Sequence, residues 1–433
     1  MAYTETTSVS WFDRLGSSFR GIGTGIVLII AGTALLWWNE GDFVGTGDAL
    51  REAQAITQEL GDISRPDAAK NGQLVHASGP LATKDMLNDP VFGLSVNAIR
   101  LERMVEFYQW VEDAKQEKRQ KLGGGEETVT TYTYAARWTP HPADSSQFRD
   151  PKARTAHRNS VLVSMENFRA QAANVTLGAY RLPDFLINAV SGATPLTVVL
   201  PEETHAKLNR QLAAAMRGET GPAPAPQEVF PNAPRPAQVA EPQMIHISGG
   251  TVLLSASPAA PRIGDVRVTF KETRPGTVSF LAKLSGDTFE QYRASNGKTV
   301  SRLSMGTHSL ENMYGDAHAA NATMTWILRA VGTALVVFGL QTLVAPLSVL
   351  VSVIPLLGDI VGAGTGIVSA LLGIAWSLVI ISIAWLRFRP LIGGAMLAVA
   401  GALIALLYVR GRARKAAVAP AQASALQGGH AGG

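Results

Sequence analysis

The chain of 433 residues contains no cysteine, which excludes disulfide bonds, thiolate metal sites and a cysteine nucleophile. Its net charge is only +4. A nucleic-acid-binding protein needs a concentrated basic face, so we expect no nucleic-acid partner. The sequence also lacks the G-x-S-x-G turn of α/β-hydrolases and the H-E-x-x-H helix of zinc proteases. We therefore predict no metal, no cofactor and no enzymatic activity.

Charge is missing altogether from two long stretches near the C-terminus. Residues 360–386 and 391–409 carry no charged side chain over 27 and 19 positions. Because a helix rises about 1.5 Å per residue, about 20 apolar residues cross the hydrocarbon core of a bilayer. We predict a membrane bundle within residues 322–409, with helices at about 324–345, 359–386 and 391–409. Residues 346–357 are apolar but contain two prolines, and either an interfacial or a re-entrant position fits them.

Near the N-terminus, residues 22–38 form a run of 17 apolar or small residues that ends in Trp37 and Trp38. The alternative is a cleaved signal peptide, since basic residues precede the run. The nearest triplet that resembles a cleavage site, at residues 53–55, lies too far beyond the run. Paired tryptophans are typical of a membrane–water interface. We therefore predict an uncleaved membrane helix with both tryptophans at the lipid headgroups.

Residues 39–321 contain no run that could cross a bilayer, so they form one large insert on one side of the membrane. The β-branched and aromatic residues of 101–112, and the clean alternation of 130–138, predict two long strands. The charged, glycine-rich segment between them makes the pair a β-hairpin. Seven prolines within 218–242 predict a mobile loop. The fold class is an α+β integral membrane protein with four transmembrane helices, one N-terminal and three C-terminal, and a β-rich insert.

Two segments of the insert resemble each other. Residues 73–79 read QLVHASG, residues 243–249 read QMIHISG, and a long strand follows each about twenty residues later. One interpretation is an internal duplication, in which both segments begin equivalent strands of two related modules. The other is a coincidence between short strand fragments.

An even number of helices places both termini on one side of the membrane. Basic residues lie beside the first helix and begin the C-terminal tail, so the positive-inside rule predicts that residues 1–21 and 410–433 are cytoplasmic. The insert is then extracytoplasmic. Arg387 and Arg389 oppose this assignment, since they would lie outside in a short connection between two helices. Arginine outnumbers lysine, and alanine and glycine dominate, which suggests a bacterial source and an inner-membrane protein with a periplasmic insert.

Two groups of residues could carry catalytic chemistry. The His, Asp and Ser of residues 140–145, with His157, suggest a hydrolase or a metal site, but no motif spacing fixes their roles. A polar loop beside the hairpin explains them better. Glu106 and Glu112 share one strand face but lie about 20 Å apart, whereas paired glycosidase carboxylates need roughly 5–10 Å. Cross-strand salt bridges are the better account of these carboxylates.

Two glycine pairs have the spacing of close-packed membrane helices. Gly21 and Gly25 lie in the first helix, and Gly362 and Gly366 lie in a later one. The second pair also resembles a dinucleotide-binding loop, but it lies inside a membrane run with no strand before it. We interpret both pairs as packing positions, because small residues four apart let helix backbones approach in lipid.

Glu40 and Arg329 are expected to form an ion pair at the outer membrane surface. Glu40 lies two residues beyond Trp38, and Arg329 lies about one turn inside the second helix. A charge at that depth is costly unless it reaches the headgroups or finds a partner. The alternative is that Arg329 binds lipid phosphate while Glu40 faces water.

Several separated motifs resemble the transmembrane protein 43 (LUMA) family, and they occur in the order of that family. They are WWNEG at 37–41, DPVFGLSV at 89–96, VEFYQWVE at 105–112, IGDVRV at 263–268, TWILR at 325–329, IPLLGD at 354–359 and WLRFRP at 385–390. The resemblance extends from about residue 20 to about residue 410. It implies a lumenal or periplasmic insert between the first helix and a C-terminal bundle.

The resemblance also bears on function. In animals the family lies in the endoplasmic reticulum and inner nuclear membrane, self-associates, binds nuclear-envelope proteins and has no established enzymatic activity. We therefore expect a homo-oligomeric, non-enzymatic scaffold that organises the membrane through its insert. A channel or transporter component is the first alternative, although the membrane portion holds few ionisable groups. An exported, membrane-anchored hydrolase is the second.

Overall fold

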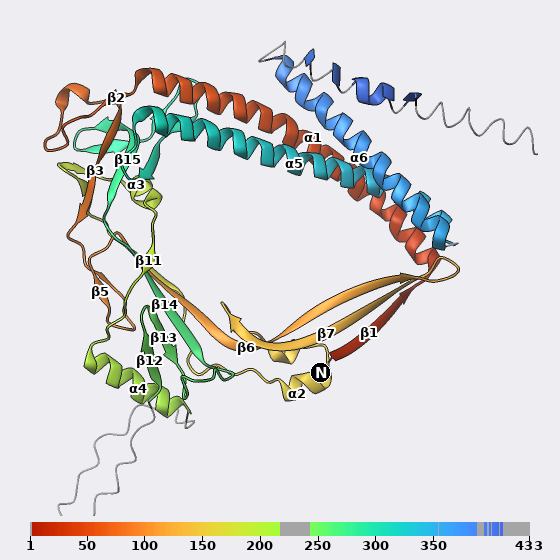
Figure 1. Cartoon of the computed structure of the whole chain (residues 1–433), viewed down its shortest axis with the longest axis horizontal. Coiled ribbons are helices and arrows are strands. Elements are labelled where there is room, and N and C mark those ends of the chain that lie inside the picture. Colours follow the sequence, from red (N-terminus) through yellow and green to blue (C-terminus); the bar gives the residue numbers. More distant parts are fainter. Residues whose placement is uncertain are drawn as a thin grey trace, which may run out of the picture.

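The computed structural model describes residues 2–216, 243–353 and 355–387, with 394–395, 398–399, 401–406 and 408–409 beyond them. The proline-rich segment 218–242, the tail 410–433 and much of the expected helix 391–409 lie outside the described residues. The described parts form a frame, with long helices on one side and paired strands on the other (Figure 1).

Three helices in the described residues are long and apolar enough to cross a membrane. They are α1 (Trp11–Ile56), α5 (Leu310–Val351) and α6 (Pro355–Leu386). Helices α1 and α5 lie side by side and antiparallel, and α6 packs against both (Figure 1). A serine caps the N-terminus of α1 and of α5, since the Ser10 and Ser309 hydroxyls accept N–H groups of the first turn at 3.2 and 3.3 Å.

The apolar runs are the central parts of longer helices. Helix α1 has 46 residues and is about 70 Å long, and it continues about five turns past Trp38. Residues 346–357 span the end of one long helix and the start of the next, because α5 continues through Pro346 to Val351 and α6 begins at Pro355.

The remaining elements belong to the insert, apart from the N-terminal strand. The short helices are α2 (Pro151–Ala156), α3 (Asp184–Ala189) and α4 (Glu202–Met216), with 3₁₀ turns at Ala68–Lys70 and Ser145–Gln147. The first strands are β1 (Ala2–Val9), β2 (Gln58–Glu59), β3 (Leu74–Thr83), β4 (Leu87–Asn88), β5 (Ser95–Val96), β6 (Arg100–Gln120), β7 (Glu126–Thr139), β8 (Phe168–Gln171), β9 (Val175–Leu177), β10 (Tyr180–Arg181) and β11 (Thr194–Pro195). The later strands are β12 (Ile245–Ser248), β13 (Thr251–Leu254), β14 (Val266–Thr273), β15 (Thr277–Ser285), β16 (Thr288–Glu290), β17 (Tyr292–Arg293), β18 (Thr299–Val300) and β19 (Arg302–Met305).

One antiparallel ribbon joins the two main sheets. One sheet has the order β1-β7-β6-β14-β13-β12, and the other has β10-β9-β3-β15-β16. Strand β14 pairs with β6, and β15, which follows β14 in the chain, pairs with β3. Between the sheets, the Ile99 N–H donates to the Thr273 carbonyl at 2.8 Å and the Leu81 N–H donates to the Gly276 carbonyl at 3.0 Å. The ladder therefore continues from sheet to sheet while residues 84–98 loop out.

The expected hairpin is present and is longer than its apolar pattern. Strands β6 and β7 pair from Phe107↔Thr139 to Gln120↔Glu126, with residues 121–125 at the tip. The outer half of this ladder is strongly charged, as in the DAKQEKRQ run of β6. Strand β1 adds a third strand along β7. Residues 1–21 were expected to be a cytoplasmic N-terminus, and no strand was expected within them.

The hairpin tip meets the ends of two helices and closes the frame (Figure 1). The Trp11 indole N–H donates to the Val349 carbonyl at 2.8 Å, and the Arg14 guanidinium donates to the Gly124 carbonyl at 2.5 Å. We call this contact the clasp: strand β1, the tip at residues 121–125, and the adjoining ends of α1 and α5.

The predicted duplication is wrong. Strand β3, which holds His76, lies inside its sheet between β15 and β9 and also pairs with β2. Strand β12, which holds His246, lies at the end of the other sheet beside β13. The two strands occupy different positions with different neighbours, so the matching heptapeptides reflect the ordinary composition of short strands.

At the opposite end of the frame from the clasp, α1 and α5 pack into the sheet. Leu50, Leu281, Met313 and Tyr314 belong to one buried apolar cluster, and all are at most 7% exposed. We call this region the joint. The Glu52 carboxylate strengthens it by accepting hydrogen bonds from the β17 loop, including one from the Tyr292 hydroxyl at 2.7 Å. Helices and insert therefore share one core here.

Candidate functional site

A buried ion pair joins α1 to α5. The Arg329 Nε lies 2.6 Å from Glu40 Oε1, and Arg329 Nη2 lies 2.7 Å from Glu40 Oε2. This two-point geometry is the strongest form of a carboxylate–guanidinium contact. The Glu40 side chain is fully buried. The structure thus brings together the two residues that the sequence placed at the outer membrane surface.

Helix α6 contributes a third group that the sequence did not indicate. The Trp385 indole N–H donates to Glu40 Oε2, so this carboxylate oxygen accepts from two helices. The Arg329 guanidinium lies 4.7 Å from the ring centre of Trp326 and 5.9 Å from that of Trp385. Phe43 stacks on Trp385 with 5.9 Å between the ring centres. We call Glu40, Arg329 and Trp385 the polar node.

Amide side chains beside the polar node fix the register of α1 against α5. The Asn39 amide donates to the Thr325 carbonyl at 3.2 Å, and the Asn321 amide donates to the Phe43 carbonyl at 3.0 Å. Together with the ion pair, these bonds tie residues 39–43 of α1 to three successive turns of α5, at residues 321, 325 and 329.

Glycines allow the two helices to approach below the polar node. A Cβ on Gly25 would lie 2.8 Å from the Gly339 carbonyl oxygen, and one on Gly32 would lie 2.7 Å from that of Gly332. Gly25 therefore packs as expected, and a Cβ on Gly21 would come within 3.1 Å of a Thr342 methyl. The other three glycines were missed, although their seven-residue spacing in each helix was a readable signal.

The second predicted glycine pair does not pack as expected. A Cβ on Gly362 would meet nothing within 4 Å, and one on Gly366 would meet only the Gln341 amide nitrogen at 3.9 Å. The close contact of α6 with α5 lies at Gly373, about two helical turns beyond Gly366. A Cβ on Gly373 would lie 2.5 Å from a Val337 methyl and 3.2 Å from the Val337 Cα.

Trp37 and Trp38 lie on the outside of the bundle, where about half of each side chain is exposed. Their exposure beside Glu40 is the arrangement expected of residues at a membrane–water interface.

The residues that suggested hydrolase chemistry have structural contacts. Asp144 accepts the Ser146 N–H at 2.9 Å, and the Ser145 hydroxyl accepts the Asn159 N–H at 2.9 Å. His157 packs on Trp110, with ring centres 4.1 Å apart. Among the described side chains, no hydrogen bond joins His157 to Ser145 or Asp144, and no group of three or more His, Cys, Asp or Glu could hold a metal ion.

The glutamates of β6 lie in cross-strand contacts. Glu106 accepts from Arg267 of β14 at 2.7 Å, and Glu102 lies 3.8 Å from Arg169 of β8. Glu112 instead accepts the Tyr134 hydroxyl at 2.7 Å. Burial, together with this hydrogen bond to a carboxylate, raises the pKa of Tyr134 to about 12.

Comparison with known proteins identifies the family. The family model for transmembrane protein 43 matches residues 107–390, about two thirds of the chain. Transmembrane protein 43 of Homo sapiens is 26% identical over 93% of this chain and 92% of its own length. The Rattus norvegicus protein is 26% identical over 90% and 89%, and a Drosophila melanogaster homolog is 28% identical over 86% and 90%. No solved structure matches. The protein is therefore a membrane protein that belongs to the transmembrane protein 43 family.

Proposed function

We propose that the protein is a non-enzymatic scaffold that holds its β-rich insert at a fixed position against one face of a membrane. The observation that supports this function is the joint. Helices α1 and α5 extend without a break from their apolar central parts into the buried apolar cluster of the joint. Movement of the insert relative to the bundle would therefore expose apolar contacts that are buried here. A rigid, extended arm of this kind suits the recruitment of partners or of further copies.

The proposed orientation has α1, α5 and α6 crossing the bilayer, with the insert outside the cytoplasm. In a bacterium this membrane is the inner membrane, and in a eukaryote it is that of the endoplasmic reticulum or the inner nuclear membrane. Exposed apolar side chains in the central part of α1, such as Val27 and Ile30, support burial in lipid. The polar node and the two exposed tryptophans then lie at the outer surface.

This orientation requires that the clasp open. If α1 crosses the bilayer between Gly21 and Trp38, the joint lies on one side of the membrane and Arg14 lies on the other. The hairpin, which belongs to the insert, would then have to cross the bilayer for its tip to contact Arg14. The outer hairpin carries charges on both faces, and a three-stranded ribbon has unpaired edges. Neither can cross hydrocarbon. The inserted protein therefore has β1 and the hairpin on opposite sides.

Introduced cysteines test the orientation, because the chain has none of its own. Thr6 and Val129 are paired across β1 and β7, and paired strand residues lie at the separation that a disulfide needs. The matched control is Lys118 with Thr128, which are paired within the hairpin itself. In sealed membranes, oxidation should link the control pair and leave Thr6→Cys/Val129→Cys unlinked, whereas in detergent both pairs should link. A Thr6–Val129 disulfide formed in membranes as readily as the control would reject the crossing of α1.

Crosslinking in native membranes tests the scaffold function itself. The expected products are homo-oligomers and complexes with other membrane or extracytoplasmic proteins, identified by mass spectrometry. Monomers alone at native abundance would argue against scaffolding. Ion flux across vesicles that contain the purified protein would favour the channel or transporter alternative instead.

A further inference from the structure

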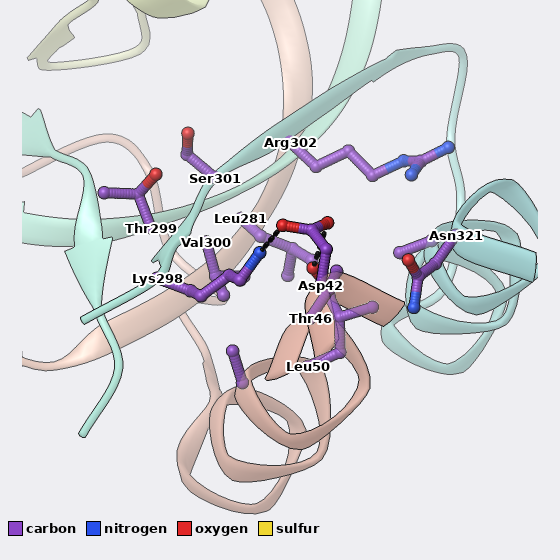
Figure 2. A pocket seen from close by; sticks show the side chains of 12 residues that line it. Asp42, Thr46, Leu50, Leu281, Lys298, Thr299, Val300, Ser301, Arg302 and Asn321 are labelled. Carbon is purple, nitrogen blue, oxygen red and sulfur yellow. Dashed lines mark hydrogen bonds and ion pairs between the residues drawn. The ribbon is translucent and has the colours of Figure 1, made fainter. Parts of the chain in front are cut away.

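A cavity of about 280 Å³ opens between α1, α5 and the strands β18 and β19 (Figure 2). Its floor is apolar and includes Leu50, Leu281 and Val300, which are all at most 7% exposed. Its rim is polar and includes Lys298 and Arg302. The volume lies just below the range of about 300–1,000 Å³ that is usual for small-molecule sites, which suits a headgroup and not a whole lipid.

The charges that line the cavity do not balance. Lys298 and Arg302 face a single anion, Asp42, and Lys298 already pairs with it. Among the described residues, the Arg302 guanidinium makes no hydrogen bond, ion pair or ring contact. Figure 2 shows its guanidinium extending past Asp42 towards α5, above Asn321. The cavity thus has a net positive charge and an unengaged planar set of N–H donors.

The position of the cavity along α1 indicates the source of its ligand. Asp42 follows Trp38 by four residues, which is about 6 Å along a helix. The headgroup layer on each side of a bilayer is about 5–8 Å thick. If α1 crosses the membrane as proposed above, the rim of the cavity lies at the level of the lipid phosphates.

We propose that this cavity binds the phosphate group of an anionic lipid headgroup. Arg302 is the principal ligand, because its guanidinium matches two phosphate oxygens at once. Lys298 supplies a second positive charge, and Asp42 weakens binding by competing for that lysine. The apolar floor accommodates the glycerol end of the lipid. This inference uses the proposed orientation only to choose a lipid as the source of the phosphate.

The test uses the full-length protein in a neutral detergent and short-chain lipids that reach the cavity in any orientation. Dihexanoyl phosphatidic acid is titrated against the wild type while its thermal midpoint is followed, with dihexanoyl phosphatidylcholine and inorganic phosphate in parallel. Arg302→Gln should weaken binding of the phosphatidic acid about tenfold or more, since it removes charged hydrogen bonds. Arg293→Gln is the matched control, because Arg293 is an exposed arginine of neighbouring β17 outside the cavity lining.

Asp42→Asn makes the test independent of folding defects, because it should tighten binding severalfold by releasing Lys298. Equal affinity of the wild type and Arg302→Gln for phosphatidic acid would overturn the site. Inorganic phosphate bound as tightly as phosphatidic acid would overturn the assignment to a lipid. Both results are separate from the cysteine test, since neither depends on whether α1 crosses a bilayer.

Discussion

Removal of one partner of the polar node should destabilise the protein far more than removal of both. Glu40→Met leaves the Arg329 guanidinium and the Trp385 N–H buried without their acceptor. Arg329→Met leaves a fully buried carboxylate with one donor. Each single variant should lose about 3 kcal/mol of unfolding free energy, the lower end of the cost of breaking a buried pair, because Arg329 retains 14% exposure.

The double variant leaves only the Trp385 N–H without an acceptor. That deficit costs about 1–2 kcal/mol, so the two substitutions should show a coupling energy of about 4–5 kcal/mol. The measurement is equilibrium unfolding in mixed micelles, followed by far-UV circular dichroism. Charge reversal at both positions should likewise recover part of the stability that either reversal loses.

Asp113 and Arg137 provide the matched control. They form the same two-point contact, at 2.7 and 2.8 Å, but on the exposed outer hairpin. A solvated pair gains little from its contact, so its cycle should show coupling indistinguishable from zero. Additive losses at Glu40 and Arg329, within about 0.5 kcal/mol, would refute the view that the polar node acts as a unit.

Three further predictions concern packing and titration. Gly32→Ala should destabilise the α1–α5 contact by about 1–3 kcal/mol, because its Cβ would lie 2.7 Å from a backbone oxygen, whereas Gly23→Ala, which meets nothing within 4 Å, should be neutral or stabilising in the same unfolding assay. Hydrogen bonds from the Asn174 backbone and side chain and from the Ala173 backbone lower the pKa of Asp85 below its ordinary 3.8. Its stabilising contribution is complete above that value and is lost as pH falls through the folded pKa, so Asp85→Asn should flatten the acid decline of the thermal midpoint. Tyr134, with its pKa raised to about 12, should ionise last in an ultraviolet titration of the folded protein, and Tyr134→Phe should remove that step without changing the earlier ones.

The sequence predicted features that depend on neighbouring residues or on charge at a known depth. The apolar runs marked the three described membrane helices, and the alternation around the glycine tip predicted the hairpin of β6 and β7. Glu40 and Arg329 could be paired because each was a charge beside an apolar run, with few partners at the same level. Trp385 could not be added, since an indole at a helix end also fits an interface.

The sequence could not predict contacts between distant segments that lack a pattern. Residues 2–9 show no alternation of apolar and polar side chains, and their partner strand lies more than a hundred residues further along the sequence. The closely packed glycines of α1 and α5 are spaced seven residues apart, whereas the four-residue spacing also occurs at Gly362 and Gly366, which are not closely packed. The similarity of residues 73–79 and 243–249 suggested a duplication that the sheets do not have. Many short strands share such a sequence, and the position of a strand in a sheet depends on the rest of the chain.

A buried ion pair is a poor means of adding stability, so its position in this bundle needs a different reason. Glycines seven apart on two antiparallel helices also permit a slip by seven residues, about 10 Å, which would still bring one glycine from each helix together. Apolar contacts in lipid discriminate weakly between such registers. After that slip, Glu40 would no longer face Arg329, and each charge would be buried alone. The polar node therefore makes one register much more stable than the other, and it does so next to the joint, where an error in register would misplace the whole insert.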